Sequence, residues 1–189
     1  MARGRRPTEE VRQEVLEAAG ELLFEVGMSR FTIDGVAARS GASKMTIYKL
    51  WPSKGALALD GYFTRVEPTL RLPDTGDIEA DLSAQLLAFV RLLRDSPAGG
   101  VIAELIGQAQ LDPALKEAFL QRYSGPRRAL AVEALDRARA RGQVRADLDA
   151  ESVIDQLWGA CYHRWLLPDQ PLTDEFATEL VRNLFRGIA

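Results

Sequence analysis

The sequence of 189 residues contains one cysteine, Cys161, and one histidine, His163. A single cysteine excludes an internal disulfide and a cysteine-based zinc cluster, and a single histidine leaves few ligands for a metal. The two residues are two positions apart, so on a helix their side chains point roughly 200° apart and cannot form a Cys–His dyad. A glycine-rich phosphate loop is also missing. We therefore expect no metal, no cofactor and no enzymatic activity.

Long hydrophobic runs are missing as well. No segment approaches the roughly 18 to 20 uncharged apolar residues that a membrane span requires. The basic N-terminus is followed by Glu9, Glu10 and Glu14, which cannot form the apolar core of a signal peptide. We therefore expect no membrane partner and a cytoplasmic location.

The alternation of apolar and polar residues that marks a half-buried strand does not occur, whereas helical periodicity runs through the chain. Capping residues and proline or glycine breaks divide the pattern into about nine helices, which predicts an all-α fold. The expected helices run from about Thr8 to Val26, Thr32 to Ser40, Lys44 to Leu50, Lys54 to Val66, from Asp77, from Pro97, Pro113 to Arg141 with a kink or split at Gly125-Pro126, Asp149 to Leu166 and Thr173 to Gly187. Gly27 is expected to end the first helix in a left-handed conformation.

The net charge of −3 is unevenly distributed. Residues 1–54 contain nine Lys or Arg and seven acids, and the remainder contains fifteen Lys or Arg and twenty acids. This asymmetry favours a nucleic-acid partner for the N-terminal part and a different role for the rest.

The N-terminal part contains two short helices joined by Ser40-Gly41-Ala42-Ser43, which have the dimensions of a helix-turn-helix. In the second helix Ile47 and Leu50 can face the core, which leaves polar side chains near solvent. Ammonium groups suit phosphate or guanine, hydroxyls suit either, and methyl groups suit thymine. The candidate DNA contacts are Thr32, Ser43, Lys44, Met45, Thr46, Tyr48, Lys49 and Lys54.

The stretch from Phe31 to Tyr48, continued by Trp51-Pro52-Ser53-Lys54-Gly55-Ala56-Leu57, resembles the TetR family of transcriptional regulators. The sequence departs from many members at Leu50-Trp51-Pro52. The resemblance implies a three-helix DNA-binding head over residues 1–53 and a larger helical domain over residues 54–189 that binds a small-molecule effector and dimerises. It also implies a homodimer on a two-fold symmetric double-stranded DNA operator, with repression relieved by the effector. Arg3, Arg5 and Arg6 would form a minor-groove arm.

The resemblance places the dimer interface on the last two long helices. The penultimate helix carries a continuous apolar face, which belongs either to packing in the core or dimer or to a ligand pocket. Dimer candidates are Ile154, Trp158, Trp165, Phe176, Leu180 and Leu184. Ligand candidates are Phe89, Leu93, Leu105, Gln108, Phe119, Tyr123, Trp158, Cys161 and Tyr162. His163 and Arg164 lie off the apolar face. They could contact a ligand or a partner subunit, or they could be structural residues.

Other interpretations stay open for several of these residues. Lys44 and Lys49 could be a solvated helix face, Tyr48 could lie at the edge of the core, and the N-terminal arginines could be a solubilising tail. The alternative function is a helical small-molecule-binding module, or a DNA-binding protein without operator specificity. The positive and hydroxyl side chains on the second helix favour the regulator.

Overall fold

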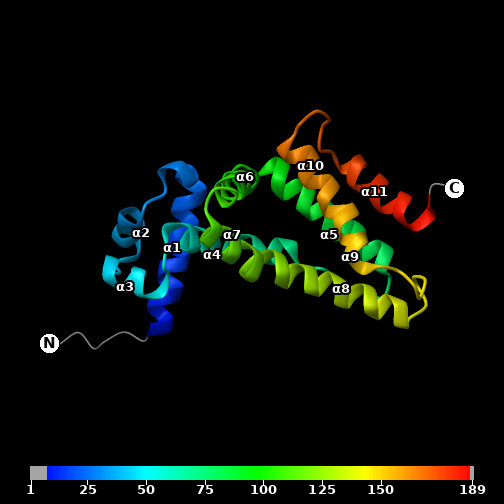
Figure 1. The fold of residues 1–189 in the computed structure, drawn as a ribbon, viewed down its shortest axis with the longest axis horizontal. Coiled ribbons are helices and arrows are strands. Elements are labelled where there is room, and N and C mark those ends of the chain that lie inside the picture. Colours follow the sequence, from blue (N-terminus) through cyan, green and yellow to red (C-terminus); the bar gives the residue numbers. More distant parts are fainter. Residues whose placement is uncertain (1–7, 188–189) are drawn as a thin grey trace. The chain divides into compact units, whose positions relative to one another are not determined.

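The computed structural model describes residues 8–187, and these form helices joined by short loops, without a strand (Figure 1). In two places a π-helical turn lies between two α-helices without a break, so that each such set of three elements is one continuous helical stretch. Counted in this way, residues 8–187 form nine continuous helical stretches, as the periodicity predicts. The α-helices are α1 (Thr8–Arg30), α2 (Ile33–Ser40), α3 (Lys44–Leu50), α4 (Lys54–Val66), α5 (Ile78–Asp95), α6 (Pro97–Ala109), α7 (Pro113–Phe119), α8 (Gly125–Ala140), α9 (Ala150–Ile154), α10 (Ala160–Leu166) and α11 (Asp174–Arg186). The remaining elements are the 3₁₀-helix η1 (Glu67–Leu70) and the π-helical turns η2 (Leu120–Ser124) and η3 (Asp155–Gly159).

The chain folds as two compact units. The first unit combines the described residues up to Glu67 with Gly100–Arg122, and the second combines Pro68–Gly99 with the described residues from Tyr123 onwards. The boundaries of these two units therefore differ from the expected boundary between residues 53 and 54. The reason is that α4 packs along α1, and α6 and α7 return to the same unit.

Backbone contact between two glycines brings α1 and α4 together in the first unit. A Cβ added at Gly20 would lie 2.9 Å from the carbonyl oxygen of Gly61, and one added at Gly61 would lie 2.9 Å from the backbone nitrogen of Gly20. Neither position can therefore carry a side chain without separating the helices. This close approach fixes α4 against α1, and α1 also contacts α2.

Gly27 divides α1 into a long helix and a short final turn. Its φ of 73° and ψ of 167° are non-helical, and one further turn follows as far as Arg30. The carboxylate of Glu104, on α6, accepts hydrogen bonds from the backbone N–H groups of Met28 and Ser29 at 2.6 Å and 3.2 Å. The expected end of the first helix at Val26 is therefore confirmed, and the φ of Gly27 is positive as predicted, although its ψ lies outside the left-handed helical region. The carboxylate of Glu104, distant in the sequence, caps the short turn that follows.

The helix starts follow the sequence closely. Side chains of Asp77, Asp112, Asp149 and Thr173 each accept a hydrogen bond from a backbone N–H in the first turn of α5, α7, α9 and α11. The expected long helix from Pro113 is continuous, but η2 precedes Gly125-Pro126 in place of a kink or split. Proline lacks an N–H and crowds the carbonyl four residues earlier, and the wider π-helical turn accommodates this.

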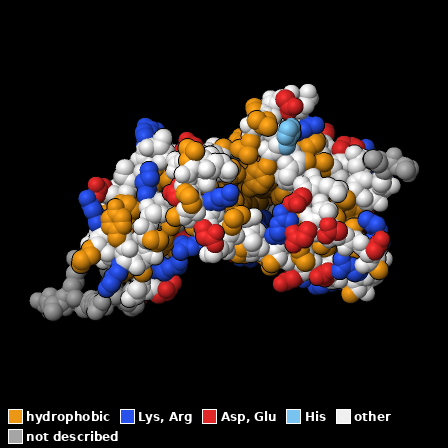
Figure 2. Space-filling view, in the orientation of Figure 1, with side chains coloured by type: hydrophobic (Ala, Val, Ile, Leu, Met, Phe, Trp, Pro, Cys, Tyr) orange, Lys and Arg blue, Asp and Glu red, His pale blue; other side chains and the backbone are white. Residues whose placement is uncertain are grey.

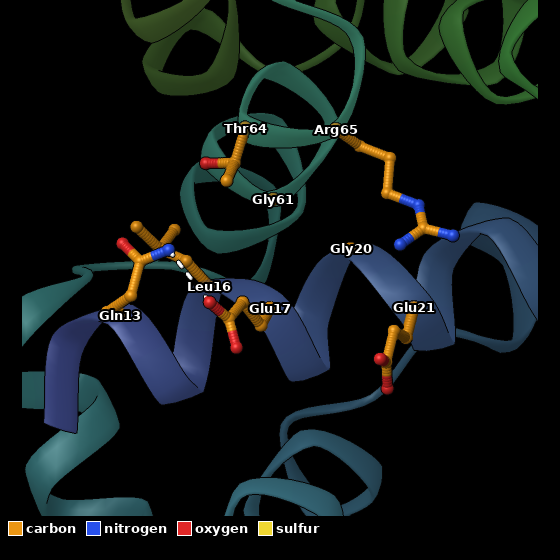
Figure 3. Close-up of a pocket in the computed structure, with 8 residues that line it drawn as sticks. All are labelled: Gln13, Leu16, Glu17, Gly20, Glu21, Gly61, Thr64 and Arg65. Carbon is orange, nitrogen blue, oxygen red and sulfur yellow. Dashed lines mark hydrogen bonds between the residues drawn. The ribbon is translucent and has the colours of Figure 1, made fainter. Parts of the chain in front are cut away.

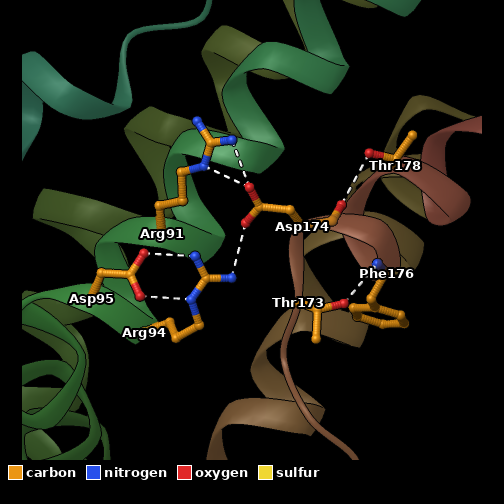
Figure 4. A network of polar contacts seen from close by, with 7 residues as sticks. All are labelled: Arg91, Arg94, Asp95, Thr173, Asp174, Phe176 and Thr178. Carbon is orange, nitrogen blue, oxygen red and sulfur yellow. Dashed lines mark hydrogen bonds and ion pairs between the residues drawn. The ribbon is translucent and has the colours of Figure 1, made fainter.

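Charged side chains fasten α11 to α5 in the second unit (Figure 4). Asp174 accepts hydrogen bonds from Arg91 Nε at 2.8 Å and from Arg94 Nη1 at 2.9 Å, and Arg94 also pairs with Asp95. Both arginines hold the pKa of the Asp174 carboxyl below its usual value. Apolar packing completes the joint, because Leu86, Val90 and Leu93 of α5 and Ala177 and Val181 of α11 are buried.

Candidate nucleic-acid interface

The helices α2 and α3 form the predicted helix-turn-helix, and each begins at a capping hydroxyl. Thr32 Oγ1 accepts from the backbone N–H of Gly35 at 3.0 Å, and Ser43 Oγ accepts from that of Thr46 at 3.1 Å. Between them Gly41 adopts φ 70°, a left-handed conformation that lets its N–H bond to the carbonyl of Ala37. These local bonds set the turn between the two helices.

Buried side chains hold α3 against the rest of the first unit. Val36 of α2 and Ile47 of α3 are fully buried, as the periodicity predicts, whereas Leu50 is half-buried. The opposite face of α3 points to solvent. Met45 is 80% exposed and Tyr48 is 55% exposed, so Tyr48 does not pack at the edge of the core. Lys44 and Lys49 are also exposed, and Thr46 is half-buried.

The exposed face therefore combines ammonium groups with a thioether, a phenol and a hydroxyl. Figure 2 shows Lys or Arg and hydrophobic side chains together at the visible surface of the part of the molecule that holds α2 and α3. Met45 and Tyr48 leave much of their apolar surface in contact with solvent in this chain. A partner with both anionic and apolar groups, such as the major groove of DNA, would contact them favourably.

Two of the predicted contacts have a structural role as well. The Ser43 hydroxyl caps α3 and also lies 2.8 Å from the Thr46 hydroxyl. The Thr32 hydroxyl caps α2 in the same way. Lys54 is the first residue of α4, exposed, one position after the Ser53 hydroxyl that caps that helix. Arg3, Arg5 and Arg6 lie outside the described residues.

Asp34 is a residue of this surface that sequence reasoning missed. Its carboxylate, in the first turn of α2, forms an ion pair with Lys44 Nζ at the start of α3. The hydrogen bond and charge of Asp34 raise the pKa of Lys44 above its usual value. The signal in the sequence is that Asp34 is the only acid between Arg30 and Lys54.

The departure at Leu50-Trp51-Pro52 forms an anchored end to α3. The Trp51 backbone N–H bonds to the Ile47 carbonyl at 2.8 Å, and its side chain is 1% exposed. The indole Nε1–H donates to Asp60 Oδ2 on α4 at 2.8 Å. The expected end at Leu50 is confirmed, and both proline geometry and indole burial account for it.

Comparisons with known proteins agree with this geometry. A family profile for bacterial regulatory proteins of the tetR family matches residues 15–60, and one for the tetracyclin repressor-like C-terminal domain matches residues 72–184. The chain belongs to the TetR family. It is accordingly a helix-turn-helix transcriptional regulator that binds DNA. Members of this family are typically not enzymes.

Two relatives and one solved structure extend the likeness over nearly the whole chain. The Bacillus subtilis regulator YdeS, of the HTH type and uncharacterized, is 37% identical over 98% of this chain and 93% of its own length. The DNA-binding transcriptional repressor TetR of Mycobacteroides abscessus is 31% identical over 88% of this chain and 87% of its own length. The crystal structure of the TetR family regulator SCO0332 is 56% identical, with a TM-score of 0.90, and covers 95% of this chain and 99% of its own.

The residues predicted to bind an effector are divided between the units of this TetR-family chain. Leu105, Gln108 and Phe119 belong to the first unit, and the other six belong to the second. In the second unit the rings of Phe89 and Tyr162 meet edge to face at 5.3 Å between centroids. Burial raises the pKa of Tyr123, with opposing effects from Arg127 and a hydrogen bond to Tyr162. These three aromatic residues therefore form one cluster.

The remaining ligand candidates are mostly packed. Leu93, Leu105 and Cys161 are fully buried, and Trp158 is half-buried. Burial raises the pKa of the Cys161 thiol to about 12, which leaves it protonated and unreactive. A cavity of about 380 Å³ lies instead between α1 and α4 of the first unit, and none of the nine candidates lines it (Figure 3). Its lining combines the apolar side chain of Leu16 with polar side chains that include Glu17 and Arg65.

The dimer candidates differ in how much surface they retain. Ile154 is buried within its own unit, so it has little surface left for a partner. Trp165 is half-buried, and its indole Nε1–H donates to the Gly99 carbonyl at 3.1 Å. Phe176 lies under the Arg164 guanidinium at 3.5 Å, so Arg164 is engaged within the chain. Half-buried Leu180 and Leu184 continue the apolar side of α11.

Across residues 8–187, no group of three or more His, Cys, Asp or Glu side chains is placed to hold a metal ion. In the same range, no helix is long and apolar enough to cross a membrane.

Proposed function

We propose that the chain is a homodimeric repressor that recognises a two-fold symmetric operator through α3 and is released from it by a small-molecule effector. The observation that carries this proposal is the exposed face of α3, where Met45 and Tyr48 project between Lys44 and Lys49 from a helix that Ile47 and Trp51 anchor in the core. A rigid helix with exposed cationic and apolar side chains is suited to reading base edges in a major groove.

The proposed contacts divide by chemistry. Met45, Thr46 and Tyr48 are suited to base edges, with the thioether and methyl groups meeting thymine methyls. Lys44, Lys49 and Lys54 are suited to phosphates or guanine, and the Ser43 hydroxyl lies at the N-terminus of α3 where a phosphate could approach. Thr32 would contribute in the same way from the start of α2. Arg3, Arg5 and Arg6 would enter the adjacent minor groove, where the potential is strongly negative.

The apolar side of α11 and the end of α10 support the proposed homodimer. Phe176, Leu180 and Leu184 are half-buried in the isolated chain, and Leu166 and Leu167 are exposed. A symmetric pairing of these helices would cover this surface, with Trp158 and Trp165 nearby on the penultimate helix. Two α3 helices in one dimer would then reach successive major grooves, about 34 to 36 Å apart.

An effector site in the larger helical domain, residues 54–189, is proposed around the aromatic cluster of Phe89, Tyr123 and Tyr162. Ligand sites in helical bundles are mostly apolar, with a few polar groups that orient the ligand. Direction of regulation is proposed from the relative in Mycobacteroides abscessus, which is a DNA-binding transcriptional repressor. We place the action of the protein in the cytoplasm, where bacterial DNA lies.

Selection of bound DNA tests the proposal. Purified protein is mixed with sheared genomic DNA of its source organism at near-physiological salt, and the bound fragments are sequenced. The double variant Lys44→Ala/Tyr48→Ala is the test, and Lys116→Ala, which removes an exposed lysine of α7, is the control.

Enrichment of a symmetric sequence by the wild type and the control, and its loss in the double variant, is the expected result. Equal retention of all fragments would contradict operator recognition and support DNA binding without sequence preference. Absence of any retained DNA would favour a helical module that binds only small molecules.

A further inference from the structure

Asp60 of α4 is the meeting point of three side chains from distant parts of the first unit. Its Oδ2 accepts from Trp51 Nε1 at 2.8 Å and from Arg122 Nη1 at 2.8 Å, and Arg12 Nη2 lies 3.9 Å away. The carboxylate side chain is only 13% exposed. Arg12 also lies over the Trp51 ring, 5.5 Å from its centroid. One carboxylate therefore holds two guanidinium groups and an indole together.

Trp51 connects this cluster to the exposed face of α3. It caps the C-terminus of α3, directly after the last helical residue, and its backbone N–H bonds to the carbonyl of Ile47, the fully buried residue of that helix. Because α3 has only seven residues, a shift of its C-cap residue would displace the whole helix. Tyr48 and Lys49 lie within three residues of Trp51. The position of the indole therefore sets the position of two proposed DNA contacts.

Arg122 connects the same cluster to the π-helical turn η2. It is the last residue of the first unit, and the next residue, Tyr123, is buried in the second unit. Arg127 lies over the Tyr123 ring at 5.6 Å. Single π-helical turns inside α-helices occur frequently at functional sites, because they aim side chains in directions that an α-helix does not. Here the turn gives adjacent residues partners in different units.

We propose that Asp60 is a positioning residue for DNA recognition, which fixes Trp51 at the end of α3 and, through Arg122, makes that position depend on the turn η2. The inference rests on the proposed function and adds the route by which regulation reaches α3. Tyr123 belongs to the proposed effector cluster, so rearrangement of η2 around it would alter the hold of Arg122 on Asp60. The indole and the end of α3 would then move.

The first measurement needs neither DNA nor effector. The indole ¹H–¹⁵N resonance of Trp51 is recorded in the full chain and identified by its loss in Trp51→Phe. Arg122→Ala is expected to shift this resonance, because it removes one of the two cations on the carboxylate that accepts the indole proton. Gln121→Ala, in the same turn but paired with Glu117, is the matched control and is expected to leave it in place.

The second measurement is affinity for the DNA duplex selected by the wild type. Arg122→Ala is expected to raise the Kd by about three- to tenfold, within the range of couplings seen for residues that act through a network. Arg122→Lys should restore most of the affinity. In the Asp60→Asn background, which keeps an acceptor for the indole but loses the charge, Arg122→Ala should have little further effect.

Each result decides the proposal separately from the proposed function. An unchanged Trp51 resonance in Arg122→Ala overturns the link between η2 and α3. A shifted resonance with an unchanged Kd overturns its consequence for DNA binding, and additive effects in the Asp60→Asn background show that Arg122 acts elsewhere. Failure of the wild type to select any duplex would contradict the proposed function instead, and the resonance would still report on the link.

Discussion

At the scale of single residues, the proposed DNA-binding surface contains its own competitor for a phosphate. Asp34 pairs with Lys44, and both side chains are exposed, at 68% and 60%. An exposed ion pair of this kind stabilises a fold by little, because solvent screens it. The pair matters more for DNA binding than for stability. A phosphate that contacts Lys44 would have to displace Asp34 or lie close to its negative charge.

Replacement of Asp34 should therefore strengthen DNA binding and weaken its selectivity. We expect Asp34→Asn to lower the Kd for random-sequence duplex more than that for the selected duplex. The slope of log Kd against log salt concentration should steepen by up to about 1, the effect of one additional phosphate contact. Fluorescence anisotropy at several salt concentrations measures both quantities.

Glu17→Gln is the control, because it removes an acid of α1 that accepts a hydrogen bond from Gln13 and not from a proposed DNA contact. If both variants strengthen binding equally, the cause is the net charge and not the pairing of Asp34 with Lys44.

At the scale of elements, the end of α1 combines an unusual backbone with a long-range cap. Gly27 has φ 73° and ψ 167°, a combination that residues with a side chain rarely adopt. The following N–H groups are satisfied by Glu104. The joint between α1 and α6 thus depends on a glycine and a carboxylate 77 positions apart in the sequence.

Gly27→Ala should destabilise the protein. Forcing alanine into this region costs about 1 to 3 kcal/mol, which corresponds to a decrease in Tm of about 2 to 12 °C for a chain of this size. Thermal unfolding followed by circular dichroism measures the change. Gly100→Ala is the control, because Gly100 lies in the helix α6 with open space around its Cβ position. Equal Tm values for the two variants would contradict the strain at Gly27.

The joint between α11 and α5 predicts a dependence of stability on pH. Arg91 and Arg94 lower the pKa of Asp174 in the folded chain, so folding favours its ionised form. This contribution is complete above the pKa of the unfolded chain, about 3.9, and is lost as the pH falls through the lower folded value. We expect the Tm to decrease as the pH is lowered from about 5, and to decrease less steeply in Asp174→Asn. Glu175→Gln, in the same turn, is the control, and equal slopes in all three proteins would contradict the role of Asp174.

Elements were predictable from the sequence where their causes are local. Thr32, Ser43, Ser53 and Thr173 cap the helices that follow them because a side-chain oxygen reaches an N–H only a few residues away. The exposed face of α3 was predictable for the same reason, since a period of 3.6 residues places Ile47 inside and Tyr48 outside.

The remaining features depend on residues that only the tertiary structure brings together. Asp60 and Arg122 are 62 positions apart, and Glu104 caps a turn 75 and 76 positions away. The turn η2 was missed because Gly125-Pro126 indicates a disturbance of the helix but not its form. The Asp34–Lys44 pair spans the turn between α2 and α3, and only the folded turn brings the two side chains together.

At the scale of the whole molecule, the proposed homodimer depends on apolar residues of α11 that the single chain covers only in part. We expect Leu180→Glu to place a charge on this surface and to convert the dimer to monomers, as measured by sedimentation velocity. Operator affinity should fall with it, because one α3 helix then reads one half-site. Truncation after Pro168, which removes α11, should likewise give monomers or aggregates.

Leu111→Glu is the matched control for the dimer. Leu111 is 89% exposed and lies in the loop between α6 and α7, outside the proposed interface. It should leave the dimer unchanged, and a dimer that survives Leu180→Glu with its mass unaltered would contradict the proposed interface.

Whether α3 reads a DNA sequence is decided by the ratio of two dissociation constants. The Kd of the wild type is measured at near-physiological salt for the selected duplex and for a shuffled duplex of the same composition, beside Lys44→Ala/Tyr48→Ala. A sequence-specific regulator should prefer the selected duplex by about 10³-fold or more, and the double variant should lose most of that preference. Equal Kd values for both duplexes, or a preference that the double variant retains, would contradict recognition through α3.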